Sequence, residues 1–69
     1  MVEVDAKGLA CPEPVMMTLA AIKEHPDEEI KVYVSSAIPR DNVERMAKKR
    51  GRNVKIEEDG SDFVLTLTK

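Results

Sequence analysis

Hydrophobic and polar residues alternate at the start of the chain and then change to a helical spacing. Residues 2–6 alternate between an apolar and a charged side chain, which predicts a strand with one solvated face. Gly8 then permits a turn. From Pro12 to about Lys23 we expect a helix, because Pro12 suits a first helical position and Pro26 disfavours helical geometry before it. The residues expected on its buried stripe are Val15, Leu19 and Ile22, with Met16 and Ala20 on the adjacent stripe.

The middle of the chain shows the same change from an alternating pattern to a helical spacing. Residues 30–35 alternate again and predict a second strand. We expect a second helix to begin between Pro39 and Asp41, because Asp41 and Glu44 resemble a capping box. Gly51 follows a cationic last turn and is typical of a helix C-terminus.

The last part of the chain predicts a hairpin. Residues 54–57 and 63–68 alternate as strands do, and Asp59-Gly60 between them is a strong turn signal. Both strand-helix-strand steps favour a parallel, right-handed crossover with the helices on the same side. We therefore expect a single α+β domain over residues 1–69, a two-layer α/β sandwich of order β-α-β-α-β-β with a four-stranded mixed sheet. Its solvated face should carry Glu3, Asp5, Lys31, Tyr33, Lys55 and Glu57.

Composition narrows the classes of function. Hydrophobic residues make up 42% of the chain but aromatic residues only 3%, so the core should be aliphatic. One cysteine excludes an internal disulfide, a Cys-x-x-Cys pair and a cysteine-rich zinc site. We expect no metal and no cofactor. No apolar run approaches membrane-spanning length, which predicts a cytoplasmic protein, and a net charge of −2 argues against direct nucleic-acid binding.

The single thiol, Cys11, stands in the stretch Gly-Leu-Ala-Cys-Pro-Glu-Pro-Val, where the first helix should begin. Unpaired N–H groups at a helix N-terminus favour a thiolate, whereas Glu13 nearby opposes it. Lys7 is the one basic residue close in sequence, and His25 lies beyond the far end of the helix. Cys11 is therefore poorly equipped for hydrolysis or a self-contained redox cycle, but it can accept and hand on a group attached through sulfur. A small buried, purely structural cysteine is the alternative.

The residues around Cys11 resemble the signature of a known family. Cys-Pro-x-Pro at the helix start, with Asp-x-x-Gly-Leu before it and Val15-Met16 after it, is similar to the TusA/SirA-like family of small sulfur carriers and sulfurtransferases. The resemblance covers nearly the whole chain and implies the same element order. It implies that Cys11 carries a persulfide sulfur from a donor protein, a cysteine desulfurase or a rhodanese-type protein, to an acceptor sulfur-relay protein. The motif scaffold would comprise Gly8, Leu9, Pro12, Glu13 and Pro14.

The chain departs from the best-known tRNA-thiolation members after the second predicted strand. Those proteins have an acidic Asp-Asp-Pro-like stretch where this chain has residues 35–39, Ser-Ser-Ala-Ile-Pro. The residues that follow, 40–43, and the ending over residues 51–60 are more similar to YedF-like proteins associated with selenium metabolism. Both tRNA thiolation and a selenium-related role remain open.

Other residues are candidates for supporting roles. Arg40 and Asp41 could be accessory to the site, since ligand sites form at the carboxyl edge of parallel strands. Met17 could form an apolar docking rim. The basic residues Lys48, Lys49, Arg50 and Arg52 either complement the helix C-terminus or dock an acidic partner. The competing hypothesis is a non-enzymatic binding or regulatory module in which Cys11 is only structural.

Overall fold

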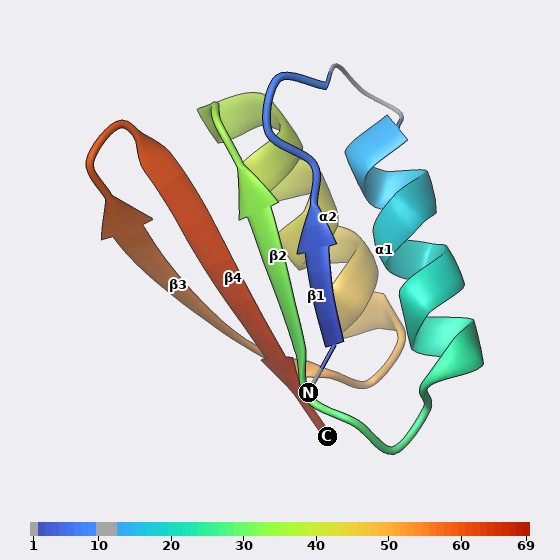
Figure 1. The fold of residues 1–69 in the computed structure, drawn as a ribbon. Coiled ribbons are helices and arrows are strands. Elements are labelled where there is room, and N and C mark those ends of the chain that lie inside the picture. Colours follow the sequence, from blue (N-terminus) through green and yellow to red (C-terminus); the bar gives the residue numbers. More distant parts are fainter. Residues whose placement is uncertain (1, 10–12) are drawn as a thin grey trace.

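A computed structural model of the protein describes residues 2–9 and 13–69 as a sheet covered on one side by helices (Figure 1). In chain order the elements are β1 (Val2–Asp5), α1 (Glu13–Glu24), β2 (Ile30–Val34), α2 (Ala37–Lys49), β3 (Asn53–Asp59) and β4 (Asp62–Thr68). The strands form one mixed sheet in the order β1-β2-β4-β3, and both helices pack on the same face. The expected α+β two-layer sandwich is confirmed.

The sheet combines one parallel pair with a hairpin. β1 and β2 are parallel, whereas β4 is antiparallel to both β2 and β3. β2 and β3 therefore run in the same direction, as two parallel crossovers require, but β4 lies between them. Leu65 and Leu67 of β4 are fully buried, while every second residue of β3 is exposed. The more apolar strand thus takes the centre of the sheet and the charged strand takes the edge.

The core lies between the sheet and the two helices. Its largest fully buried side chains from the sheet are Ile30, Val32, Val34, Leu65 and Leu67. Burying each side chain of this kind contributes about 1.5–3 kcal/mol. The helices cover them with the buried residues Ala21, Ile22, Val43 and Ala47. The opposite sheet face carries the six polar residues that the alternation predicts, and none of them is buried.

The buried face of α1 differs from the expected stripe by about one residue. Pro14, Thr18, Ala21 and Ile22 are buried, whereas Met16 is 62% exposed and Ala20 is exposed. Thr18 can be buried because its hydroxyl donates a hydrogen bond to the Pro14 carbonyl at 2.8 Å. The expectation that Val15, Leu19 and Ile22 form the buried stripe was therefore wrong except at Ile22, although Val15 packs against the core.

The start of α2 was also predicted wrongly. The helix begins at Ala37 after an extended Ser36, and its first intrahelical bond runs from the Arg40 N–H to the Ser36 carbonyl at 3.3 Å. Asp41 is therefore inside the helix and is not its cap. Pro39 lies in the first turn, where a missing N–H costs nothing, so it does not mark the helix start. The predicted end is confirmed, because Gly51 follows α2 with φ +82°.

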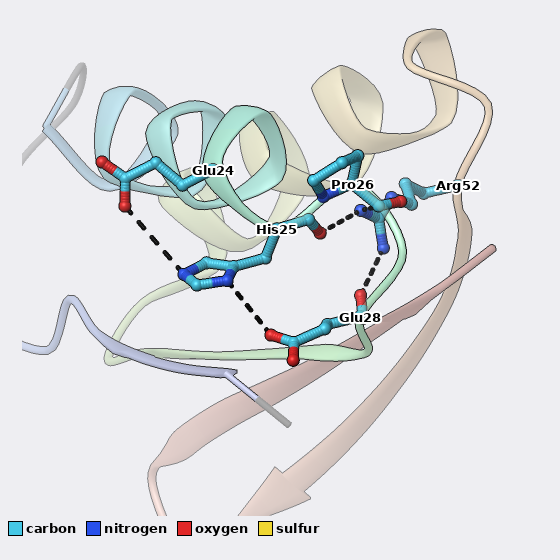
Figure 2. A network of polar contacts seen from close by, with 5 residues as sticks. All are labelled: Glu24, His25, Pro26, Glu28 and Arg52. Carbon is cyan, nitrogen blue, oxygen red and sulfur yellow. Dashed lines mark hydrogen bonds and ion pairs between the residues drawn. The ribbon is translucent and has the colours of Figure 1, made fainter.

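Arg52, which lies between α2 and β3, fixes the loop between α1 and β2. Its side chain is buried, with the residue 6% exposed, and its guanidinium donates to the carbonyls of His25, Pro26 and Glu28 at 3.1, 3.2 and 2.8 Å (Figure 2). A buried cation needs such partners, and three carbonyl oxygens supply them. Arg52 is therefore a structural residue rather than a docking residue, which corrects its assignment to the basic docking set.

Replacing Arg52 with methionine should lower the free energy of unfolding by about 2 kcal/mol, because hydrogen bonds from a charged donor are lost at a buried site. Urea denaturation measures this. The matched control is Arg50→Met, since Arg50 is exposed at the end of α2 and its loss should cost less than about 1 kcal/mol. Equal losses for the two variants would contradict the structural role of Arg52.

On the polar face, the Tyr33 hydroxyl donates to Oε2 of Glu3 at 2.9 Å. This hydrogen bond to a carboxylate raises the pKa of Tyr33, because it favours the protonated phenol. Tyr33 is the only tyrosine, so its ionisation can be followed by ultraviolet absorbance. The midpoint should move to lower pH in Glu3→Ala and stay in place in Glu57→Ala, a carboxylate on the same face. An unmoved midpoint in Glu3→Ala would show that the bond does not form.

Candidate functional site

The site predicted from sequence lies on the connection between β1 and α1. Cys11 and Pro12 are outside the described residues, which end at Leu9 on one side and resume at Glu13 on the other. Glu13 is the first residue of α1, so Cys11 precedes the helix by two positions in sequence. The structure describes the two flanking segments, residues 6–9 and the first turns of α1.

The segment before Cys11 is held by hydrogen bonds to β2 and to the residues after it. The Ala6 N–H donates to the Tyr33 carbonyl at 2.8 Å, and the Gly8 N–H donates to Oγ of Ser35 at 2.9 Å. The Leu9 N–H donates to the Ala6 carbonyl at 3.3 Å and closes the turn. Gly8 has φ +79°, a left-handed conformation that other residues rarely adopt. Gly8 and Leu9 therefore occupy a fixed turn, as a motif scaffold requires.

The segment after Cys11 is anchored in the core. The Pro14 side chain is fully buried, and its carbonyl accepts the Thr18 hydroxyl bond. Glu13 is exposed. The first-turn N–H groups of Glu13 and Val15 have no acceptor within the helix, and they present the positive end of the helix dipole. An anionic sulfur near this helix end would be favoured by these groups.

Two side chains that fix these segments were not found from the sequence. Ser35 is 27 positions away from Gly8, and no local pattern indicates that its hydroxyl bonds the turn. Thr18 follows Pro14 by four positions, the spacing at which a threonine hydroxyl can reach a helical carbonyl. That spacing is a usable signal, but the apolar stripe that we expected on α1 concealed it.

Arg40 and Asp41 lie near the start of α2, at the same end of the molecule as the start of α1 (Figure 1). They contact each other: Nη2 of Arg40 is 2.9 Å from Oδ1 of Asp41. The Arg40 guanidinium also lies 4.7 Å from the centre of the Phe63 ring, a cation–π distance. These contacts give Arg40 a structural role, since its guanidinium packs on Phe63 of β4. Its accessory role at the site stays a prediction.

The proposed docking residues divide into two groups. Met17 is 39% exposed on α1, one turn after the helix start. Lys48, Lys49 and Arg50 are exposed at the C-terminal end of α2, and Lys48 pairs with Glu44 at 3.2 Å. Since α2 spans 13 residues, about 20 Å of helix separates this basic end from the end where α1 and α2 begin. The structure therefore does not bring the basic cluster to the motif.

Within residues 2–9 and 13–69, few other side chains could take part in a reaction at the motif. His25 follows the far end of α1, where its Nδ1 lies 3.1 Å from the Glu28 carboxylate. Among the described residues no group of His, Asp and Glu side chains is placed to hold a metal ion. Neither α1 nor α2 has the length and apolar character needed to cross a membrane. The described part of the site thus offers helix N–H groups and a rigid frame.

Comparison with known proteins identifies relatives of the chain. The family model described as Sulfurtransferase TusA matches residues 2–69. Among solved structures, the crystal structure of a SirA-like protein from Desulfitobacterium hafniense superposes with a TM-score of 0.89 at 30% identity, covering 97% of this chain and 95% of the other. Comparison with curated protein sequences gives no significant match. The Cys-Pro-x-Pro motif, the fold and the family match agree with one another, and the chain belongs to the TusA family of sulfurtransferases.

Proposed function

We propose that the protein is a cytoplasmic sulfur carrier that accepts a persulfide sulfur on Cys11 and passes it to an acceptor protein. The donor is a cysteine desulfurase or a rhodanese-type protein, and the acceptor is a sulfur-relay protein. Family membership and the presence of a single cysteine in the motif support this proposal. One observation carries it furthest: both segments that flank Cys11 are anchored, by the Gly8–Ser35 bond before it and by buried Pro14 after it.

The transfer needs no oxidant and no cofactor. The Cys11 thiolate attacks the outer sulfur of the donor persulfide, a sulfur–sulfur bond to Cys11 forms, and the donor cysteine leaves as a thiolate. The carrier then holds Cys11-S-SH. In the second step an acceptor thiolate attacks this outer sulfur, and the Cys11 thiolate leaves. Each step breaks one sulfur–sulfur bond and forms another, so the protein only has to position a thiolate.

Residues on both sides of the motif cysteine support this sulfur transfer. The first-turn N–H groups of α1 favour the anionic forms of the free and persulfurated cysteine. Gly8, through its bond to Ser35, and buried Pro14 fix the described segments on the two sides of the motif cysteine. Exposed Met17 adds apolar surface for that partner. The same chemistry at Cys11 serves tRNA thiolation or selenium metabolism, because only the acceptor or the cargo atom differs.

Incubation with a cysteine desulfurase and cysteine should add one sulfur atom to the protein, measured by intact mass spectrometry. A reductant should remove it and restore the original mass. Cys11→Ser should gain no mass, because it removes the only thiol of the chain. The proposal fails if several unrelated persulfide donors leave the wild-type mass unchanged, or if Cys11→Ser gains the same sulfur.

The alternative, a binding or regulatory module with a structural Cys11, makes a different prediction for stability. A carrier cysteine can be replaced by serine with a change in unfolding free energy within about 0.5 kcal/mol, as for surface positions. A buried structural cysteine would lose more than about 1 kcal/mol, because a hydroxyl would enter an apolar site. Urea denaturation of Cys11→Ser distinguishes the two, with Ser61→Ala in the exposed hairpin turn as the control.

A further inference from the structure

A groove runs between the edge strand β1 and helix α1, beside the motif. It has a volume of about 330 Å³. One wall is the whole of β1, and the other consists of residues on one side of α1 and just after it, Met17, Ala20, Ala21, Glu24 and His25. β1 stands at the end of the strand order, and Figure 1 shows it at the sheet edge nearest α1. The groove therefore follows an open strand edge.

The backbone of β1 has hydrogen-bonding groups directed into this open side. The Val2 N–H donates to the Glu29 carbonyl at 2.9 Å, and the Ala6 N–H donates to the Tyr33 carbonyl at 2.8 Å. In a parallel ladder, alternate residues bond the same neighbour. The backbone N–H and C=O groups of the even-numbered residues of β1 thus point toward β2. The backbone N–H and C=O groups of Glu3 and Asp5 point outward. An extended chain can bond to these groups as an added strand.

Three of the residues that form the α1 wall of the groove, Met17, Ala20 and Ala21, are apolar. Met17 is 39% exposed, Ala20 is exposed, and Ala21 beneath them is 8% exposed. In an added strand, alternate side chains would point toward this surface. Apolar side chains at those positions would cover Met17 and Ala20, which the fold otherwise leaves to solvent. The adaptable methionine suits contact with a partner.

The charge of the groove is acidic. Among the described residues, its lining includes the carboxylates of Glu3, Asp5 and Glu24 but neither lysine nor arginine. His25 lies at one end of the groove, and its two nitrogens already face Glu24 and Glu28 at 4.0 and 3.1 Å (Figure 2). Glu3 and Asp5 point to the polar sheet face, where the other alternate side chains of an added strand would lie. Lysine or arginine at those positions would complement them.

We propose that this groove binds an extended segment of a partner protein in which apolar residues alternate with lysine or arginine. The segment adds to the free edge of β1, its apolar side chains cover Met17 and Ala20, and its basic side chains meet Glu3 and Asp5. β1 leads through residues 6–9 toward Cys11, so the partner would be held beside the motif. This binding is independent of the chemistry at Cys11 and goes beyond the proposed carrier function.

The test uses a short capped peptide in which valine and lysine alternate, followed by amide nuclear magnetic resonance of the labelled protein. The amides of Glu3 and Asp5 should shift and become protected from hydrogen exchange, because they gain hydrogen-bond partners. A peptide that alternates valine and glutamate should bind at least tenfold more weakly. Equal binding of the two peptides, or shifts confined to the face of β3, would overturn the proposal.

Two variants of Glu3 separate backbone bonding from charge. Glu3→Ala removes the carboxylate and keeps the outward N–H, so binding should fall severalfold. Glu3→Pro also removes the N–H, without loss of a bond to β2, so binding should fall at least tenfold further. Equal affinities for the alanine and proline variants would contradict strand addition. β4 does not pair with β1, so dispersed β4 amide signals show that each variant is folded.

A third variant tests the groove without touching β1. Ala20→Arg places a bulky cation on the exposed apolar wall and should weaken binding of the lysine peptide at least tenfold. Ala37→Arg is the matched control, since it makes the same substitution at an exposed alanine on α2. Its binding should stay within twofold of the wild type. If both variants bind as the wild type does, the groove is not the binding site.

Discussion

The packing of one aliphatic sheet face against both helices is the interaction on which the rest of the structure depends. The chain has 69 residues and very few aromatic side chains, so the fully buried Ile, Val and Leu residues of β2 and β4 supply most of its core. Both helices must cover the same face to bury them. Because β1 and β2 run parallel, the connections to α1 and to α2 begin at the same end of the molecule.

The packing of both helices on one sheet face explains where the two segments that flank the motif lie. The turn after β1 can be tied to Ser35 only because β1 and β2 are parallel neighbours that end together. The start of α1 is fixed because Pro14 and Thr18 share a place in the core. A carrier of sulfur needs this kind of frame, and it can leave acid-base chemistry to its partners. Within the described residues, β1 is the end strand of the sheet, so one of its edges is open.

The sequence predicted most of the architecture because period-two and helical patterns report directly on one-sided burial. All four strands, the hairpin at Asp59-Gly60, the end of α2 at Gly51 and the polar sheet face were found in this way. The insertion of β4 between β2 and β3 was not foreseen, since pairing between distant strands leaves no local pattern. The start of α2 was missed because Asp41 and Glu44 were interpreted as a capping box, and because Pro39 is tolerated within the first turn and so does not mark the start.

The sequence also did not predict the contacts of single polar side chains whose partners are distant in the chain, and these misses share a cause. Arg52 stands next to a run of exposed cations and is indistinguishable from them in sequence, yet it reaches three carbonyls more than 20 positions away. Ser35 bonds Gly8 across 27 positions. Within the site, the sequence located Cys11 and its glycine and proline neighbours through the motif. It could not show which residues anchor them.

We propose that Cys11, two positions before the first residue of α1, reacts as an accessible thiolate. The most direct measurement is the rate at which iodoacetamide alkylates Cys11 across the neutral pH range, in the folded protein and in urea. Because Cys11 is the only thiol, mass spectrometry reports on it alone. The account predicts faster alkylation in the folded protein than in the unfolded chain at neutral pH, since helix N–H groups favour the reactive anion. Slower alkylation in the folded protein would show a buried, structural cysteine and contradict the account.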